Sequence, residues 1–93
     1  MSAKISDDMT WEEYSRKIGL QLQKERERRK WSQERVAYDA HMSKVQYQRI
    51  EGGGYRNDPV SNPTIKSLIA IAEVLDLKIT DLLAQPWPDL RSR

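Results

Sequence analysis

Four side chains between residues 44 and 49 combine long hydrogen-bond donors with one apolar group. On a helix they would stand at positions i, i+1, i+4 and i+5 and form one contiguous patch, made of Lys44, Val45, Gln48 and Arg49. Lysine and arginine can donate to the O6 and N7 of guanine, glutamine can pair with adenine, and valine can meet only a thymine methyl. The pattern predicts a helix that reads base edges in the major groove of DNA.

Contacts with the DNA backbone need a second set of donors. Gln33 would open the preceding helix, where free backbone N–H groups and the helix dipole attract an anion. Gln33 and these amides are therefore predicted phosphate contacts. The further candidates are polar residues around the two helices: Ser32, Ser43, Gln46, Tyr55 and Arg56, with Arg28, Arg29 and Lys30 in or near the preceding turn.

The net charge of +2 is unevenly distributed along the 93 residues. Residues 1–15 hold one lysine against four acidic residues, and residues 57–93 hold four basic residues against five acidic ones. Residues 16–56 hold eleven basic residues against five acidic ones. A basic centre is typical of a phosphate-binding surface, although a charge run such as Lys24–Lys30 is by itself more often a solvated helix face.

Apolar residues recur at spacings of three and four, and no long alternation indicates a strand. We expect an all-α, compact five-helix bundle. Serine and threonine caps, the glycines Gly52–Gly54 and the prolines delimit the helices. The expected ranges are 11–29, 33–40, 43–51, 63–75 and 79–84, with Pro63 just ahead of, or at the first position of, the fourth helix.

The second and third helices, joined by a tight turn at His41–Met42, have the layout of a helix-turn-helix, with Ser32 and Ser43 as caps. Tyr47 and Ile50 would anchor the third helix inward. Residues 18–83 resemble the lambda-repressor-like family (Cro and phage-repressor type, often called XRE). The matching stretches are Ser32–Ala37, Met42–Ser43, Arg49–Gly53, Asn62–Ala72, Leu75 and Thr80–Leu83.

The resemblance implies roles for individual residues. Gln33 falls on the family's phosphate-contacting glutamine, and Lys44, Val45 and Arg49 fall on its base-reading positions. Arg26 and Glu51 fall on an arginine–glutamate pair that ties the first helix to the end of the third, which we interpret as structural.

Three features depart from the family pattern. His41 replaces the usual turn glycine, so a positive φ there would carry strain. Tyr47 replaces a smaller aliphatic residue and is expected to push its hydroxyl to the surface. The loop from Gly53 to Asn62 is long, which leaves the roles of Tyr55 and Arg56 open.

No enzyme is expected, because the chain has no cysteine, a single histidine and no catalytic constellation. Gly52–Gly54 lacks the following Lys-Ser/Thr of a phosphate cradle. No cofactor, metal or membrane span is expected, and the cytoplasm is the expected location. Double-stranded DNA is the expected partner.

The favoured function is a transcriptional repressor that binds a palindromic operator as a homodimer through its fifth helix and C-terminal tail. The alternative is an antitoxin or adaptor whose main partner is a protein. The features behind that alternative are an acidic N-terminal extension with Trp11 and Tyr14, expected to be core or partner contacts, and a proline-rich tail. In that tail, Trp87 and Leu90 could pack on their own chain or form a dimer seam. We expect residues 1–9 to be a disordered tail, residues 10–84 the domain, and residues 85–93 a C-terminal tail.

Overall fold

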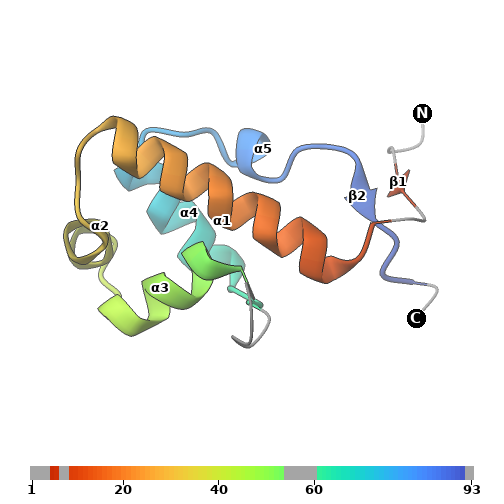
Figure 1. Cartoon of the computed structure of the whole chain (residues 1–93), viewed down its shortest axis with the longest axis horizontal. Helices are drawn as coiled ribbons and strands as arrows, with labels where there is room; N and C mark the ends of the chain where they lie inside the picture. Colours follow the sequence, from red (N-terminus) through yellow and green to blue (C-terminus); the bar gives the residue numbers. More distant parts are fainter. Residues whose placement is uncertain (1–4, 7–8, 54–60, 92–93) are drawn as a thin grey trace.

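The computed structural model describes residues 5–6, 9–53 and 61–91. These residues form five helices, in the all-α arrangement predicted from the sequence. The helices are α1 (Trp11–Arg28), α2 (Gln33–Asp39), α3 (Lys44–Gly52), α4 (Ile65–Val74) and α5 (Ile79–Leu82). Figure 1 shows α1 running through the middle of the molecule, with α2 at one end and α3 alongside. The radius of gyration, 13.3 Å, is that of a compact domain of this length.

Side-chain caps fix where four of the helices begin. Thr10 and Glu13 form a reciprocal capping box at the start of α1. Ser32, Ser43 and Thr64 each accept a hydrogen bond from the backbone N–H three residues on, at the starts of α2, α3 and α4. Pro63 therefore precedes the cap of α4 and lies outside the helix.

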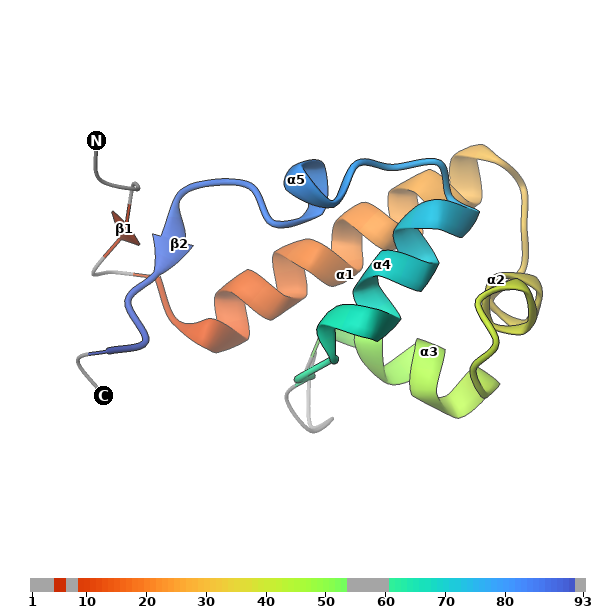
Figure 2. The same cartoon turned by 180° about the vertical axis from the view of Figure 1, so that it is seen from behind.

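One hydrophobic core joins the helices. Its fully buried members are the side chains of Leu22, Val36, Tyr47, Ile71 and Leu75. Figure 2 shows α4 lying across α1 with α3 beside it. Gly19 lets α1 and α3 approach closely, because a Cβ there would overlap the backbone carbonyl of Glu51.

Three helices end in the same hydrogen-bonded turn. After α1, the N–H of Trp31 donates to the carbonyl of Arg26, and the N–H of Lys30 donates to the carbonyl of Glu27. The N–H groups of His41 and Met42 after α2, and those of Asp76 and Leu77 after α4, form the same two bonds. This is the Schellman motif, which needs a left-handed residue just past the helix. That residue is not glycine in any of the three: φ is +60° at Lys30, +59° at His41 and +54° at Asp76. Gly53, with φ +57°, ends α3.

The chain ends differ from the expectation of no strand. Ile5–Ser6 (β1) pairs in parallel with Trp87–Pro88 (β2), with Ile5 opposite Trp87. Met9 is buried in the core. The expectation of disorder across residues 1–9 is therefore wrong for β1 and Met9, while residues 1–4 and 7–8 lie outside the described part. The division into a domain and two tails stays a prediction.

Candidate nucleic-acid interface

α2, the turn at His41–Met42 and α3 form a helix-turn-helix. The turn is tight because the N–H of Met42 returns to the carbonyl of Ala37, which requires the left-handed backbone of His41. Val36 and Ala37 of α2 and Ile50 of α3 are buried between the two helices and the rest of the core. The turn thus fixes the direction in which α3 leaves α2.

α3 presents a polar face to solvent. Lys44, Val45, Gln48 and Arg49 are all exposed, and Val45 retains 55% of its accessible surface. Neither Lys44 nor Arg49 forms an ion pair with another described residue, so both charges are available to a ligand. The side chains assigned to base reading therefore lie together on one open surface.

The inward face of α3 buries two side chains, Ile50 and Tyr47. Ile50 is buried as predicted, and Tyr47 is fully buried. The expectation that the Tyr47 hydroxyl reaches the surface is wrong: that oxygen is buried, and no described residue lies at hydrogen-bonding geometry to it. Burial raises the pKa of Tyr47, and the nearby carboxylate of Glu51 raises it further.

Arg26 of α1 and Glu51 of α3 form a two-pronged ion pair. The Nε and Nη2 of Arg26 donate to the two carboxylate oxygens of Glu51, both at 2.9 Å, and Arg26 Nη1 donates to the carbonyl of Trp31 at 2.8 Å. The Glu51 side chain keeps only 4% of its surface and that of Arg26 only 12%. Burial alone would raise the pKa of Glu51, but the hydrogen bonds from Arg26 and Gln33, together with the nearby Tyr47 hydroxyl, outweigh it and lower that pKa.

Gln33 lies between the buried ion pair and the exposed face. Its Nε2 donates to Glu51 at 3.0 Å, and its Oε1 accepts from Nε2 of Gln48 at 3.2 Å. The half-buried Gln33 amide is thus already engaged, with one N–H left to donate. No pattern in the sequence indicates this link, because Gln33, Gln48 and Glu51 meet only through the packing of α2 against α3.

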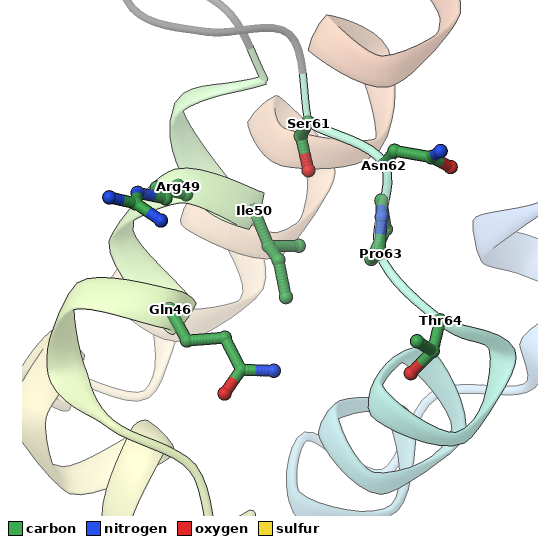
Figure 3. Close-up of a pocket in the computed structure, with 7 residues that line it drawn as sticks. All are labelled: Gln46, Arg49, Ile50, Ser61, Asn62, Pro63 and Thr64. Carbon is green, nitrogen blue, oxygen red and sulfur yellow. The ribbon is translucent and has the colours of Figure 1, made fainter.

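A hollow of about 400 Å³ separates α3 from the start of α4. Gln46 and Ile50 point toward it from α3, Arg49 borders it with its guanidinium turned away, and Asn62, Pro63 and Thr64 form the opposite wall (Figure 3). Nε2 of Gln46 bonds Oγ of Ser67 at 3.3 Å and links α3 to α4. The hollow continues the open surface of α3, and Gln46 is one of its polar groups.

The other predicted phosphate contacts divide into two groups. Ser32 and Ser43 are exposed, and their hydroxyls accept the capping bonds of α2 and α3. Tyr55 and Arg56 lie outside the described residues.

The turn between α1 and α2 is strongly basic. Arg28 and Arg29 both bond Glu25, whose pKa is lowered by these two hydrogen bonds. The guanidinium of Arg35 stacks over the ring of Trp31 at 4.3 Å. The contact of Arg35 with Trp31 was not predicted, because an arginine four residues after a tryptophan is common and does not by itself indicate that the two side chains stack.

The aromatic residues near the chain ends bond their own chain. The indole of Trp11 donates to the carbonyl of Ser61, the hydroxyl of Tyr14 to that of Ala84, and the indole of Trp87 to that of Leu83. Trp87 also packs against the core. Of the two interpretations left open for Trp87, packing on its own chain is the one observed, while Leu90 is 53% exposed.

Within residues 5–6, 9–53 and 61–91, no cluster of three or more histidine, cysteine or acidic side chains could hold a metal ion. None of the helices described has the length and apolar character needed to cross a membrane.

This fold and this surface define a helix-turn-helix DNA-binding regulator of the lambda-repressor-like type. Residues 17–83 match the family described as "Helix-turn-helix domain", and the chain belongs to that family. No curated protein sequence matches the chain significantly.

Solved structures share the fold. The restriction-modification controller protein C.AhdI from Aeromonas hydrophila has a TM-score of 0.62 at 20% identity, over 73% of this chain and 94% of that one. The N-terminal DNA binding domain of SinR from Bacillus subtilis has a TM-score of 0.61 at 26% identity, over 73% and 91%. C.Esp1396I bound to a 19 base pair DNA duplex has a TM-score of 0.60 at 27% identity, over 75% and 85%.

Proposed function

We propose that this protein is a sequence-specific transcriptional repressor that binds a palindromic operator in double-stranded DNA as a homodimer. One observation carries the proposal: Lys44 and Arg49, which form no ion pair with another described residue, stand exposed on α3, whose opposite face is anchored by the buried Tyr47, Ile50 and Glu51. A short rod with a rigid inner face and a donor-rich outer face fits the major groove. A dimer covering an operator excludes other proteins from that DNA, so repression is the simplest outcome.

Base reading is assigned to Lys44, Val45, Gln48 and Arg49. Phosphate contacts are assigned to the polar groups beside α3, namely Ser32, the remaining N–H of Gln33, Ser43 and Gln46, and to Tyr55 and Arg56 from the sequence. The similar protein C.Esp1396I, which was solved on a DNA duplex, supports this use of the fold.

The homodimer follows from the limited reach of one short helix. Two copies about 34 Å apart on one face of the duplex double the number of base pairs read. The fifth helix and the tail were the expected contact; Ile79 at the start of α5 and Leu83 just past its end are half-buried. The neighbouring α4 adds Ile65, 69% exposed, and Ile69, 43% exposed, four residues apart on one helix face. We assign the dimer contact to this combined α4–α5 surface.

Selection of bound sites from random duplex DNA tests the proposal, and we expect a palindromic motif. Arg49→Ala should weaken binding to the selected site by about 1–3 kcal/mol and relax the preference at one base pair. Lys78→Ala removes an exposed charge just before α5 and serves as the control that leaves the preference intact. Unchanged affinity and preference in Arg49→Ala would contradict the docking.

Two further measurements check the surface and the assembly. Affinity should fall steeply with salt as phosphate contacts release counterions, and a flat response would contradict the assigned phosphate contacts. Sedimentation should show a dimer that Ile69→Lys weakens. A monomer both free and on a palindromic site would rule the dimer out.

The antitoxin or adaptor alternative gains no support from the contacts described. The aromatic residues on which it depended, Trp11, Tyr14 and Trp87, all bond the carbonyls of their own chain. We therefore retain DNA binding as the function, and place the protein in the cytoplasm with the DNA it binds.

A further inference from the structure

Four side chains form a continuous hydrogen-bonded path from the interior to the surface of α3. The path runs from Arg26 to Glu51, then to Gln33, then to Gln48, and each step is 2.9 to 3.2 Å. We infer that this path, here called the amide relay, fixes the orientation of the Gln48 amide so that it recognises adenine in the operator, with Gln33 as its positioning residue. The inference rests on the proposed DNA-binding function and adds to it the base that this position reads.

The buried carboxylate gives the relay a single direction. Glu51 is ionised, since its pKa is lowered, and an ionised carboxylate can only accept hydrogen bonds. The amide nitrogen of Gln33 must therefore face Glu51, which turns the Gln33 oxygen toward Gln48. That oxygen also can only accept, so the nitrogen of Gln48 must face it. An ordinary surface glutamine can flip its amide at little cost, whereas a flip of Gln48 would set two oxygens against each other.

The fixed amide leaves a defined pair of groups for DNA. After one N–H of Gln48 is used by Gln33, its oxygen and its second N–H remain, and Gln48 is exposed. One acceptor and one donor side by side match the N6 amino group and N7 of adenine in the major groove, whereas guanine presents two acceptors there. The orientation is set before binding, which lowers the entropy lost when the contact forms.

The relay gives Gln33 a different signature from a phosphate clamp. A residue that contacts only phosphate changes affinity on all sequences equally, because phosphates carry no sequence information. A residue that positions a base-reading amide changes the preference at one base pair. Gln33 keeps one free N–H for a phosphate, so its loss should produce both effects, and the change in preference is the one that reports the relay.

The test is a double-mutant cycle on Gln33 and Gln48, read out as relative affinity for the selected operator and for its single-base variants. Gln48→Ala should reduce discrimination for adenine at one base pair by roughly 5- to 150-fold, the worth of a good paired contact. Gln33→Ala should reduce discrimination at the same pair by roughly 2- to 10-fold, the worth of one neutral hydrogen bond. In the Gln48→Ala background, Gln33→Ala should no longer change that preference.

Two variants complete the design. Gln46→Ala is the matched control, because Gln46 is a glutamine of the same helix whose amide bonds Ser67 and takes no part in the relay; it should leave the adenine preference unchanged. Gln48→Glu keeps Gln33 intact and so remains informative if Gln33→Ala fails to fold. A carboxylate there can accept from N4 of cytosine, so the preference should shift from adenine to cytosine.

The outcomes separate the two proposals. Uniform weakening on every sequence in Gln33→Ala, or an adenine preference that survives Gln48→Ala, would overturn the relay while leaving palindromic DNA binding in place. A native chain that selects no sequence from random duplex DNA would overturn the proposed function, and the relay with it.

Discussion

Arg26 and Glu51, 25 positions apart in the chain, face each other through two hydrogen bonds of equal length, 2.9 Å. The pair joins α1 to the last turn of α3. Because Glu51 also holds Gln33, the same carboxylate contributes to the packing of the core and to the arrangement of the outer face.

The first prediction concerns the stability of this pair. Arg26→Ala should lower the free energy of unfolding by about 3–5 kcal/mol, because it leaves the buried carboxylate of Glu51 without its counter-charge. Chemical denaturation measures the loss. Arg28→Ala is the control: Arg28 also pairs with a glutamate, Glu25, but its side chain is 63% exposed, so its removal should cost at most about 1 kcal/mol. Equal losses in the two variants would contradict the role of burial.

The second prediction is the pH dependence that Glu51 confers. Folding lowers its pKa below the ordinary value of 4.5, so the stabilisation is fully present above about that pH and is lost as the pH falls through the lower pKa of the folded state. Urea titrations of the native chain and of Glu51→Gln, from pH 7 down to acid, measure it. The difference in unfolding free energy should be largest at pH 7 and shrink below pH 4.5. A difference that stays constant would show that folding does not change the pKa of Glu51 and would contradict the prediction.

The third prediction concerns the hydroxyl of Tyr47. It is buried and has no hydrogen-bond partner in the described part of the chain, so Tyr47→Phe removes an unsatisfied polar group and keeps the ring. The free energy of unfolding should stay unchanged or rise by up to about 1 kcal/mol. Tyr38→Phe, at a tyrosine that is 80% exposed, should have no effect. A clear loss of stability in Tyr47→Phe would mean that the hydroxyl does bond a partner, either the nearby Glu51 carboxylate or an ordered water.

The fourth prediction uses the three left-handed residues after α1, α2 and α4. Glycine adopts this backbone without a Cβ penalty. Replacing any of the three residues by glycine should therefore raise the free energy of unfolding by up to about 1 kcal/mol; the variants are Lys30→Gly, His41→Gly and Asp76→Gly. Lys24→Gly, inside α1 at an exposed position, should instead lower it by about the same amount. Destabilisation by all four changes would contradict the strain at these turns.

Helix positions were accessible from the sequence because they depend on local signals. Ser32, Ser43 and the glycines after α3 mark boundaries through the backbone itself, and the apolar spacing marks the inward faces. The family resemblance supplied the pairing of Arg26 with Glu51, which no local pattern contains. The exposed outer face of α3 followed from the same periodicity.

The parts that sequence reasoning did not find depend on packing between distant elements. The hydrogen bond between Gln33 and Gln48 forms only because the packing of α2 against α3 brings the two side chains together. The burial of the Tyr47 hydroxyl depends on the space left by neighbouring side chains. The β1–β2 pair was missed because two-residue strands carry no periodicity that could be recognised.

The parallel alignment of Ile5–Ser6 with Trp87–Pro88 has a practical consequence for handling the protein. Both segments lie at the end of the molecule away from α2 (Figure 1). An affinity tag, fluorophore or chip linker joined near either segment would leave unobstructed the exposed face of α3, which we propose binds DNA. Two fluorophores, one near each segment, would sit close together, so energy transfer between them would report whether the two segments stay paired.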